Sequence, residues 1–221
     1  MKAALAFVLC FAPALASAQI AGVAADALTP AGMTRVEVEI PERETDGVWL
    51  YFAPEGATRA TLRAQVYVAP SAQAARDAEA LHAQSIAGDL DALSGLGDRA
   101  SGGASMLTFV RDNVFVVLQR LGGQLDCRPA AHAIDAALRA APRGPATTRL
   151  AVEIPMLVEG TNALQLPAAA LGAHVVASGS AAARRARDGW VVTRRGGEAW
   201  SVTVLAADAM LRRVRVERTG S

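Results

Sequence analysis

The chain has 221 residues, of which 52% are hydrophobic, and its 22 basic and 21 acidic residues give a formal net charge of +1. This length and apolar content support one or two domains with substantial cores. A chain so close to neutral has no overall field that would draw it to nucleic acid or to an anionic membrane, so nucleic acid is excluded as an expected partner.

The N-terminus has the pattern of a cleavable signal peptide, residues 1–18. Lys2 forms a short basic region, residues 3–15 are apolar, and residues 16–18 spell Ala-Ser-Ala, the small-x-small pattern that signal peptidases accept. The apolar run is shorter than the roughly 20 residues that span a bilayer. We expect cleavage after Ala18, a periplasmic or secreted protein, and no membrane span after the signal is removed.

Removal of this segment changes the chemistry of the chain. Lys2 is the only lysine and Cys10 is one of 2 cysteines, so the mature chain keeps Cys127 as its single thiol. Without lysine there is no Walker A lysine, no Schiff base and no Ser-x-x-Lys acyl enzyme. The sequence also lacks His-Glu-x-x-His, Cys-x-x-Cys and Gly-x-Ser-x-Gly motifs. We therefore expect no cofactor and no metal site.

The first segment of the mature chain is interpreted as a tether or a first edge segment, because residues 19–33 are small, Ala-rich and without a clear period. Three strands are expected after it. Residues 36–40 alternate Val and Ile with Glu, residues 48–52 form the second strand, and residues 61–68 form the third. The alternation predicts strands with one buried face and one wet or functional face.

Two helices are expected in the first two thirds of the chain. The first begins after Ser71, a good N-cap, and ends at Gly88. The second runs from Pro129 to Ala141. Its apolar stripe consists of Ala131, Ile134, Leu138 and Ala141, and its opposite, polar stripe consists of His132, Asp135 and Arg139.

Between the two helices the sequence predicts a β-hairpin. Residues 106–110 and 114–118 are rich in β-formers, and residues 112–113, Asp-Asn, are a two-residue turn signal. Pairing Arg111 with Val114 makes both faces of the hairpin apolar. We therefore expect a central hairpin that is covered on both sides.

After a Pro- and Gly-rich stretch at 142–145, the sequence predicts only short strands. The spacing of these strands is typical of a small β-sandwich. We predict an α+β fold, in which residues 34–145 form an antiparallel sheet covered by two helices and residues 146–221 form a small all-β sandwich. The seven expected strands are 150–154, 163–166, 174–177, 182–187, 190–193, 200–206 and 212–217.

The end of the chain resembles a known kind of domain. Residues 197–208, Gly-Glu-Ala-Trp-Ser-Val-Thr-Val-Leu-Ala-Ala-Asp, and the closing run at 214–216, Val-Arg-Val, resemble the last two strands of bacterial immunoglobulin-like domains. The resemblance covers the C-terminal third only, and the inter-sheet cysteine pair of antibody domains is absent. It implies an immunoglobulin-like sandwich that serves as a spacer or an adhesion module.

Cys127 is the candidate for catalysis. It lies just before Pro129, where the positive end of the second helix would make a thiol more acidic and more reactive, and His132 is the partner to consider. Helical spacing instead puts His132 on the polar stripe. We interpret Cys127 as a small buried or half-buried thiol and His132 as solvent-facing, with a thiol-dependent catalytic pair as the alternative.

His82 and Glu79 lie three residues apart on the first predicted helix. This spacing occurs in carboxylate-bridged metal sites, which also need a second such pair and further carboxylates. The sequence offers no second pair, so we interpret His82 as structural or exposed.

Two surfaces are candidates for binding. If the second and third predicted strands present the same face, they form an aromatic and polar platform that suits a sugar or a peptide. The alternative is that its rings pack against the second domain or the linker. The residues of this platform are Trp49, Tyr51, Arg63, Gln65 and Tyr67.

The second surface is an Arg-rich hairpin that is expected to turn at residues 188–189. This turn pairs Arg187 with Trp190, a cation-π arrangement that would bind a polyanion such as lipopolysaccharide or a surface glycan. The alternative is an ordinary hairpin whose solvated positions are Arg. The candidate polyanion-binding residues are Arg185, Arg187, Trp190 and Arg194.

The missing catalytic motifs favour a non-catalytic exported binding or accessory protein. Its expected partner is another envelope protein or a glycan. Two alternatives remain open. One is a thiol-dependent enzyme or redox protein that uses Cys127, and the other is a small-ligand carrier with a deep cavity beside the doubly apolar hairpin.

Overall fold

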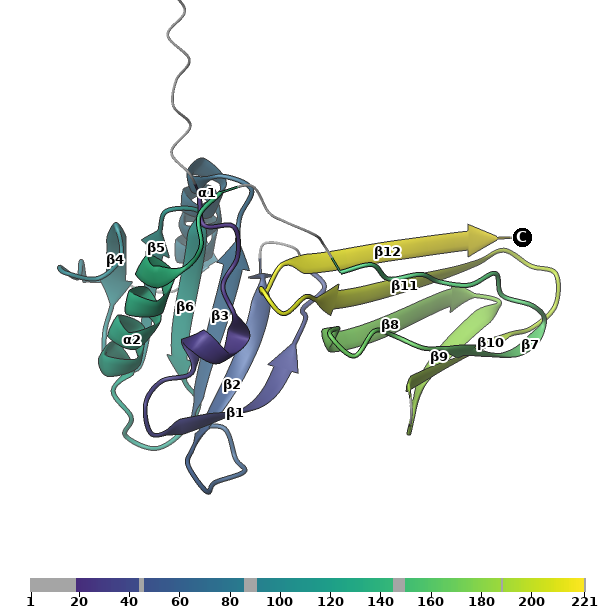
Figure 1. Ribbon diagram of the computed structural model, residues 1–221, viewed down its shortest axis with the longest axis horizontal. Helices are drawn as coiled ribbons and strands as arrows, with labels where there is room; N and C mark the ends of the chain where they lie inside the picture. Colours follow the sequence, from purple (N-terminus) through teal and green to yellow (C-terminus); the bar gives the residue numbers. More distant parts are fainter. Residues whose placement is uncertain (1–18, 44–45, 86–90, 145–149, 188, 221) are drawn as a thin grey trace, which may run out of the picture.

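The computed structural model describes residues 19–43, 46–85, 91–144, 150–187 and 189–220 (Figure 1). Antiparallel strands are the most abundant regular structure in this part of the chain and two α-helices accompany them, so the α+β class is confirmed. Among these residues, no helix is both long enough and apolar enough to cross a membrane.

A six-stranded antiparallel sheet forms the N-terminal part of the molecule, with strand order β1-β2-β3-β6-β5-β4. The strands predicted over 48–52, 61–68, 106–110 and 114–118 are confirmed, whereas the short edge strand β4 was not predicted. The strands are β1 (Met33–Glu39), β2 (Val48–Pro54), β3 (Leu62–Val68), β4 (Arg99–Gly102), β5 (Met106–Arg111) and β6 (Val114–Arg120).

The β5–β6 hairpin lies inside the molecule and is buried on both faces. Its register pairs Arg111 with Val114, as predicted. One face contributes Phe109 and its neighbours to the main core, and the other contributes Phe115 and its neighbours to a second core. Both predicted apolar faces are therefore confirmed, because each packs against its own helix.

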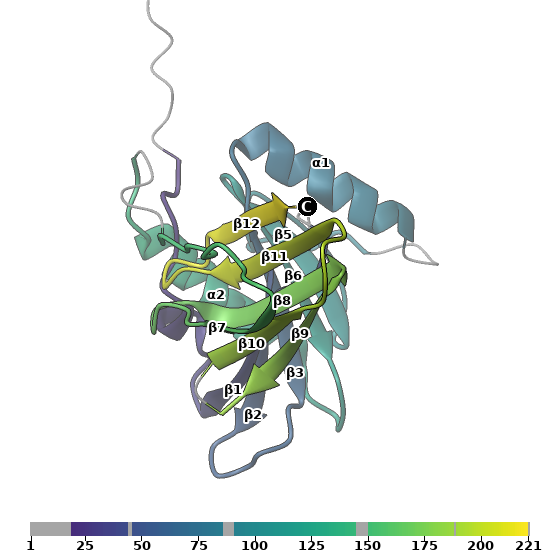
Figure 2. The same cartoon turned by 90° about the vertical axis from the view of Figure 1, so that its right-hand side faces the viewer.

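The helices α1 (Ala72–Ser85) and α2 (Cys127–Ala140) lie on opposite faces of this sheet (Figure 2). The Ser71 hydroxyl caps α1 by accepting a hydrogen bond from the backbone N–H of Ala74 at 3.1 Å. Helix α2 begins two residues before the predicted start, because the Asp126 carboxylate accepts the N–H of Arg128 and caps it. The predicted end of α1 at Gly88 lies outside the described residues.

Residues 19–33 are packed rather than extended as a tether. They contain a short 3-10 helix, η1 (Ala25–Leu28), and the side chains that face the core are almost fully buried. The tether interpretation is therefore wrong. The buried residues of this segment include Ile20, Val23, Ala25 and Leu28.

The C-terminal part consists of two three-stranded antiparallel sheets, β7-β10-β9 and β12-β11-β8. Six of the strands predicted here are confirmed. Residues 150–154 form no strand, although Val152 and Ile154 are buried in the core between the sheets. The strands are β7 (Gly160–Leu164), β8 (Leu171–Gly179), β9 (Ala181–Ala186), β10 (Gly189–Arg194), β11 (Trp200–Ala207) and β12 (Arg213–Gly220).

The two parts are joined by a common core and by specific contacts. Leu211, in the turn between β11 and β12, is 1% exposed and belongs to the main core of the N-terminal part. On the neighbouring strand β8, Gly172 has a φ of +57°, and a Cβ there would lie 2.8 Å from the carbonyl oxygen of Val38. Glycine at this position therefore permits the close approach of β8 to β1. The predicted boundary between residues 145 and 146 lies outside the described residues.

Candidate functional site

The strands β2 and β3 present the predicted platform residues on one face of the sheet. Their register pairs Trp49 with Gln65 and Tyr51 with Arg63, and Tyr67 follows Gln65 on the same side. The opposite face of these strands, including Val48 and its alternating neighbours, is buried in the main core. Helix α1 covers the β5 and β6 end of the platform face.

The platform is held together by contacts between its own side chains. The Arg63 guanidinium lies 4.2 Å from the centre of the Trp49 ring, and its Nη2 donates to the Gln119 side-chain oxygen at 2.5 Å. The Tyr51 hydroxyl donates to Glu39 at 2.5 Å. Burial and the bond to Glu39 raise the pKa of Tyr51, so the phenol stays a hydrogen-bond donor at neutral pH.

Trp49 Nε1 and His82 Nε2 are among the buried polar atoms that have no hydrogen-bond partner within the described residues. His82 is placed by the last turn of α1 and packs edge-on against the Phe115 ring, with the ring centres 5.7 Å apart. Burial lowers the pKa of His82, which keeps the imidazole neutral at neutral pH. Unsatisfied buried polar groups are costly and uncommon, so each calls for a physical explanation such as a functional role.

Glu79, on the same helix, does not act with His82. Its side chain is 4% exposed and its nearest cation is Arg99 on β4, at 3.5 Å. Burial raises the pKa of Glu79. Within the described ranges, no group of three or more His, Cys, Asp and Glu side chains is arranged to hold a metal ion.

A groove of about 710 Å³ lies between β1 and the C-terminal sheets. We call it the charged groove, because one wall carries Glu37, Glu39 and Glu42 and the other carries Arg185 and Arg187. Its aromatic end is formed by Trp190 and His174, whose rings meet edge to face with their centres 5.7 Å apart.

Glu39 connects the charged groove to the platform. Its carboxylate accepts the hydroxyl of Tyr51 and also lines the groove. The structure therefore brings together two surfaces that sequence reasoning treated as separate. Gln119 was missed because the pairing of β3 with β6 joins residues far apart in the sequence. Glu39 lies close in sequence to its partner Trp49, and it was missed because the sequence reasoning did not pair β1 with β2.

The Arg-rich hairpin β9–β10 differs from the prediction. Gly189 pairs with Ala186, so Trp190 lies opposite Arg185 rather than Arg187. The predicted pair of Arg187 with Trp190 is therefore wrong, although the two-residue shift keeps Arg185 on the same face as Trp190.

Arg194 does not belong to the exposed part of this hairpin. Its Nη1 donates to the carbonyl oxygen of Leu157 at 3.1 Å, and its guanidinium lies 5.8 Å from the centre of the Trp200 ring. Arg194 thus supports the C-terminal core. A polyanion is also disfavoured in the charged groove, because the wall that faces the two arginines is acidic.

Cys127 is fully buried at the start of α2, and its thiol donates to the carbonyl oxygen of Ser105 at 3.5 Å. Burial and the nearby Asp126 carboxylate raise the pKa of this thiol. The expected activation by the helix N-terminus is therefore overcome by burial. His132 is exposed on the same helix, as interpreted from its spacing.

We predict that a disulfide reagent modifies Cys127 at least about tenfold more slowly in the folded protein than in denaturant, because only the thiolate reacts and burial disfavours it. Absorbance of the released thiolate measures the rate. Cys127→Ser supplies the background. A rate in the folded protein equal to that of an unfolded thiol would contradict the interpretation of Cys127 as a buried, unreactive thiol. It would then favour the catalytic alternative.

Asp135 lies at the centre of a charged network near the C-terminal end of α2. Its side chain is 3% exposed and accepts hydrogen bonds from Arg111 at 2.7 and 2.9 Å and from Arg139 at 2.7 Å. Burial alone would raise the pKa of Asp135, but these bonds hold it below its usual range. Asp135 lies on the predicted polar stripe of α2 but is buried, because Arg111 of β5 pairs with it.

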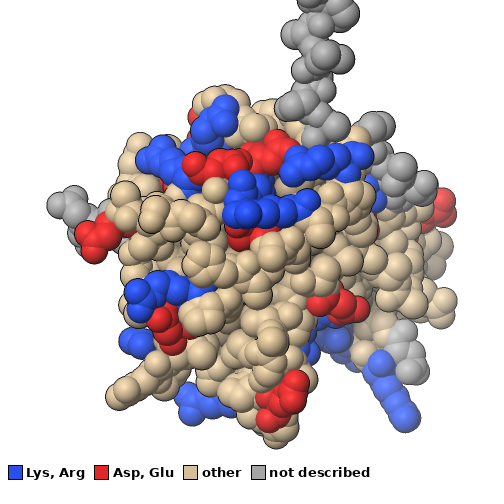
Figure 3. Space-filling model, turned by 60° about the vertical axis from the view of Figure 1, so that its left-hand side comes forward, with Lys and Arg blue, Asp and Glu red and all other residues tan. Residues whose placement is uncertain are grey.

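The same network continues to the β5–β6 turn, where Asp98 accepts from Arg111 at 2.5 Å and Arg143 pairs with Asp112. Its members bond to one another, which indicates a structural role in holding α2 to the hairpin. Figure 3 shows basic and acidic side chains side by side near the top of the face in view, so no single sign dominates that face.

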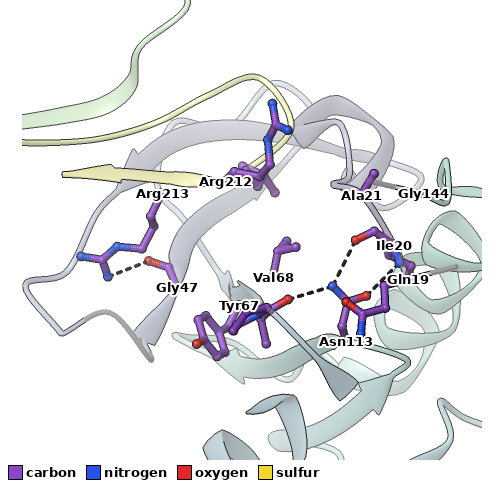
Figure 4. Close-up of a pocket in the computed structure, with 13 residues that line it drawn as sticks. Gln19, Ile20, Ala21, Gly47, Tyr67, Val68, Asn113, Gly144, Arg212 and Arg213 are labelled. Carbon is purple, nitrogen blue, oxygen red and sulfur yellow. Dashed lines mark hydrogen bonds between the residues drawn. The ribbon is translucent and has the colours of Figure 1, made fainter. Parts of the chain in front are cut away.

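The apolar faces of the β5–β6 hairpin are filled by side chains from the two helices. A separate pocket of about 420 Å³ lies elsewhere (Figure 4). Asn113, in the turn, is the residue of this hairpin that lines it. The pocket lies where the segment from Gln19 meets the β11–β12 turn. The buried hairpin itself thus gives no support to the small-ligand carrier.

Comparison with known proteins finds no protein-family model, no curated protein and no solved structure that matches this chain. The geometry of the platform and the charged groove is therefore the basis for inferring a function.

Proposed function

We propose that this chain is an exported, non-catalytic binding or accessory protein whose binding surface is the platform together with the charged groove. The observation that carries the proposal is the position of Glu39, which accepts the Tyr51 hydroxyl at 2.5 Å and also lines the groove. A ligand seated in the groove would reach the platform along one continuous surface. Export follows from the signal-like residues 1–18.

The charges of the groove indicate the kind of ligand. Glu37 and Glu42 stand on one wall, and Arg185 and Arg187 stand on the other. These walls suit a polymer that carries ammonium and carboxylate groups a short distance apart. Among envelope polymers, a cell-wall glycan with attached peptides has both groups, so it fits better than a uniformly anionic polysaccharide.

The platform would contribute hydrogen bonds rather than ring stacking. Arg63 already lies over the Trp49 ring, whereas the indole N–H of Trp49 and the Nε2 of His82 make no hydrogen bond among the described residues. Both atoms are buried, so a hydroxyl or amide group of the ligand would reach either of them only after neighbouring side chains move.

The C-terminal part is proposed to act as an immunoglobulin-like spacer that carries one wall of the groove. Two three-stranded antiparallel sheets around an apolar core support this proposal. The resemblance of residues 197–208 and 214–216 to such domains is the sequence argument for it.

A sedimentation assay with purified cell-wall sacculi tests the proposal. The full mature protein is expected to pellet with intact sacculi, and the double variant Arg185→Gln/Arg187→Gln is expected to bind about tenfold more weakly, equivalent to about 1.4 kcal/mol. The double variant Glu37→Gln/Glu42→Gln is also expected to bind sacculi more weakly, because it removes negative charge from the opposite wall. The fraction of protein in the pellet, measured against sacculus concentration, gives the affinity.

Arg184→Gln is the matched control, because Arg184 is exposed on the same hairpin but pairs with Val191 on its other face. It should bind as the unaltered protein does. Sacculi whose peptides have been removed by an amidase should not pellet the protein. Equal binding of all variants, or equal binding to the peptide-free glycan, would refute the assigned surface or the assigned ligand.

A further inference from the structure

The chain is anchored firmly from Gln19 onward. The Gln19 carbonyl oxygen accepts a hydrogen bond from the N–H of Gly144 at 2.9 Å. The N–H of Ile20 donates to the buried Asn113 side chain at 2.8 Å, and Asn113 donates back to the Ile20 carbonyl at 3.1 Å. The N–H of Ala21 donates to the carbonyl of Pro142 at 3.0 Å. The backbone is thus fixed on the C-terminal side of the Gln19 α-carbon.

Gln19 is half-buried and lines the 420 Å³ pocket shown in Figure 4. This pocket gives the Gln19 side chain space beside the anchored carbonyl. Arg212 and Arg213 also line the pocket. Their guanidinium groups are already paired, with Asp208 and with backbone carbonyls of residues 41–43 respectively.

We propose that Gln19, once it becomes the N-terminal residue, is converted to pyroglutamate. This inference rests on the proposed cleavage after Ala18, not on the proposed ligand. The α-nitrogen of Gln19 attacks the Cδ of its own side-chain amide. A bond forms between the α-nitrogen and Cδ, the bond between Cδ and the amide nitrogen breaks, and that nitrogen leaves as ammonia with a proton from the α-amine. No oxidant or reductant is needed.

The cyclic product is compatible with the anchored backbone. The anchored carbonyl and the N–H of Ile20 keep their bonds, because neither atom takes part in the reaction.

The consequence is a protein with no primary amine. Lys2 is the only lysine of the chain and leaves with the signal peptide, so the α-amine of Gln19 would be the last amine present. Cyclisation consumes it. The mature protein would then be inert to every reagent and enzyme that requires an amine, including aminopeptidases that need a free N-terminus.

The test uses the full chain, exported with its own signal and purified without a tag. Intact mass spectrometry should give the mass of residues 19–221 less one ammonia. An N-hydroxysuccinimide ester should leave this protein unlabelled. The control Gln19→Ala, which keeps the cleavage pattern but cannot cyclise, should carry one label per chain.

Each result has a distinct meaning. A mass that begins at Gln19 with its amide intact overturns cyclisation while leaving the cleavage site in place. A mass that begins at another residue overturns the cleavage site and the inference with it. Labelling of the unaltered protein to the level of Gln19→Ala also overturns cyclisation. None of these outcomes bears on binding to the charged groove, so the two proposals fail separately.

Discussion

Replacing Asp135 by alanine is expected to lower the free energy of unfolding by about 3 kcal/mol, the low end of the range for breaking a buried ion pair. The change leaves Arg111, whose side chain is 15% exposed, without its main buried partner. Asp98 remains beside Arg111 and moderates the loss. Urea denaturation followed by circular dichroism measures the effect.

Asp98→Ala is the control, because the Asp98 side chain is 52% exposed and its pair with Arg111 is worth less than about 1 kcal/mol. The pKa of Asp135 is lower in the folded state than its usual value, so its stabilising contribution is complete above the unfolded-state pKa and is lost as pH falls through the folded-state pKa. The stability gap between the unaltered protein and Asp135→Ala should therefore narrow in acid. A gap that is constant or that widens in acid would contradict the pairing.

Replacing Leu211 by alanine is expected to cost about 2–5 kcal/mol, as for other buried leucines. Leu211 is 1% exposed and carries the β11–β12 turn into the core of the N-terminal part. Its φ is +55°, a left-handed conformation that is strained for a residue with a Cβ. Thermal and urea unfolding of the purified variant measure the loss.

A glycine variant separates the loss of the buried Leu211 side chain from the strain of its left-handed backbone. Leu211→Gly removes the same side chain but relieves the backbone strain, so it should be at least as stable as Leu211→Ala, the reverse of the usual order. Met156→Ala is the surface control, because Met156 is 66% exposed, and it should change stability by less than about 0.5 kcal/mol. If Leu211→Ala proved as mild as this control, Leu211 would not join the two parts.

Local patterns predicted the centre of the N-terminal sheet. Period-2 alternation located β2 and β3, and the Asp-Asn turn fixed the register of β5 and β6. Both are properties of neighbouring residues, so they can be read without knowledge of the fold. The same reasoning failed for residues 19–33, whose burial depends on partners near residue 210.

Helical spacing predicted which residues share a side of α2, but it did not predict which of these sides are buried. Ile134 and Leu138 are buried as expected. Asp135 is also buried, because Arg111 from β5 reaches it, and no helical pattern carries information about a partner on another element. The Asp-Gly pair at 188–189 predicted that Trp190 pairs with Arg187, whereas the pairing of β9 with β10 places Trp190 opposite Arg185.

The candidate site was predicted only in part. The shared face of Trp49 and Arg63 followed from simple alternation in two adjacent antiparallel strands. The charged groove did not, because it requires β1 to face the β9–β10 hairpin across the groove, and the two segments are far apart in the sequence. Glu39, the residue that links the two surfaces, is recognisable only after both pairings are known.

Arg213 gives the groove a property that its lining alone does not. From the first residue of β12 it donates hydrogen bonds to the carbonyl oxygens of Pro41, Glu42 and Gly47, along the connection that follows β1. Together with Leu211, it ties the C-terminal sheets to the strand that forms the acidic wall. These contacts hold the acidic wall to the C-terminal sheets, so the entropic cost of binding there would come mainly from ordering the ligand and the arginine side chains.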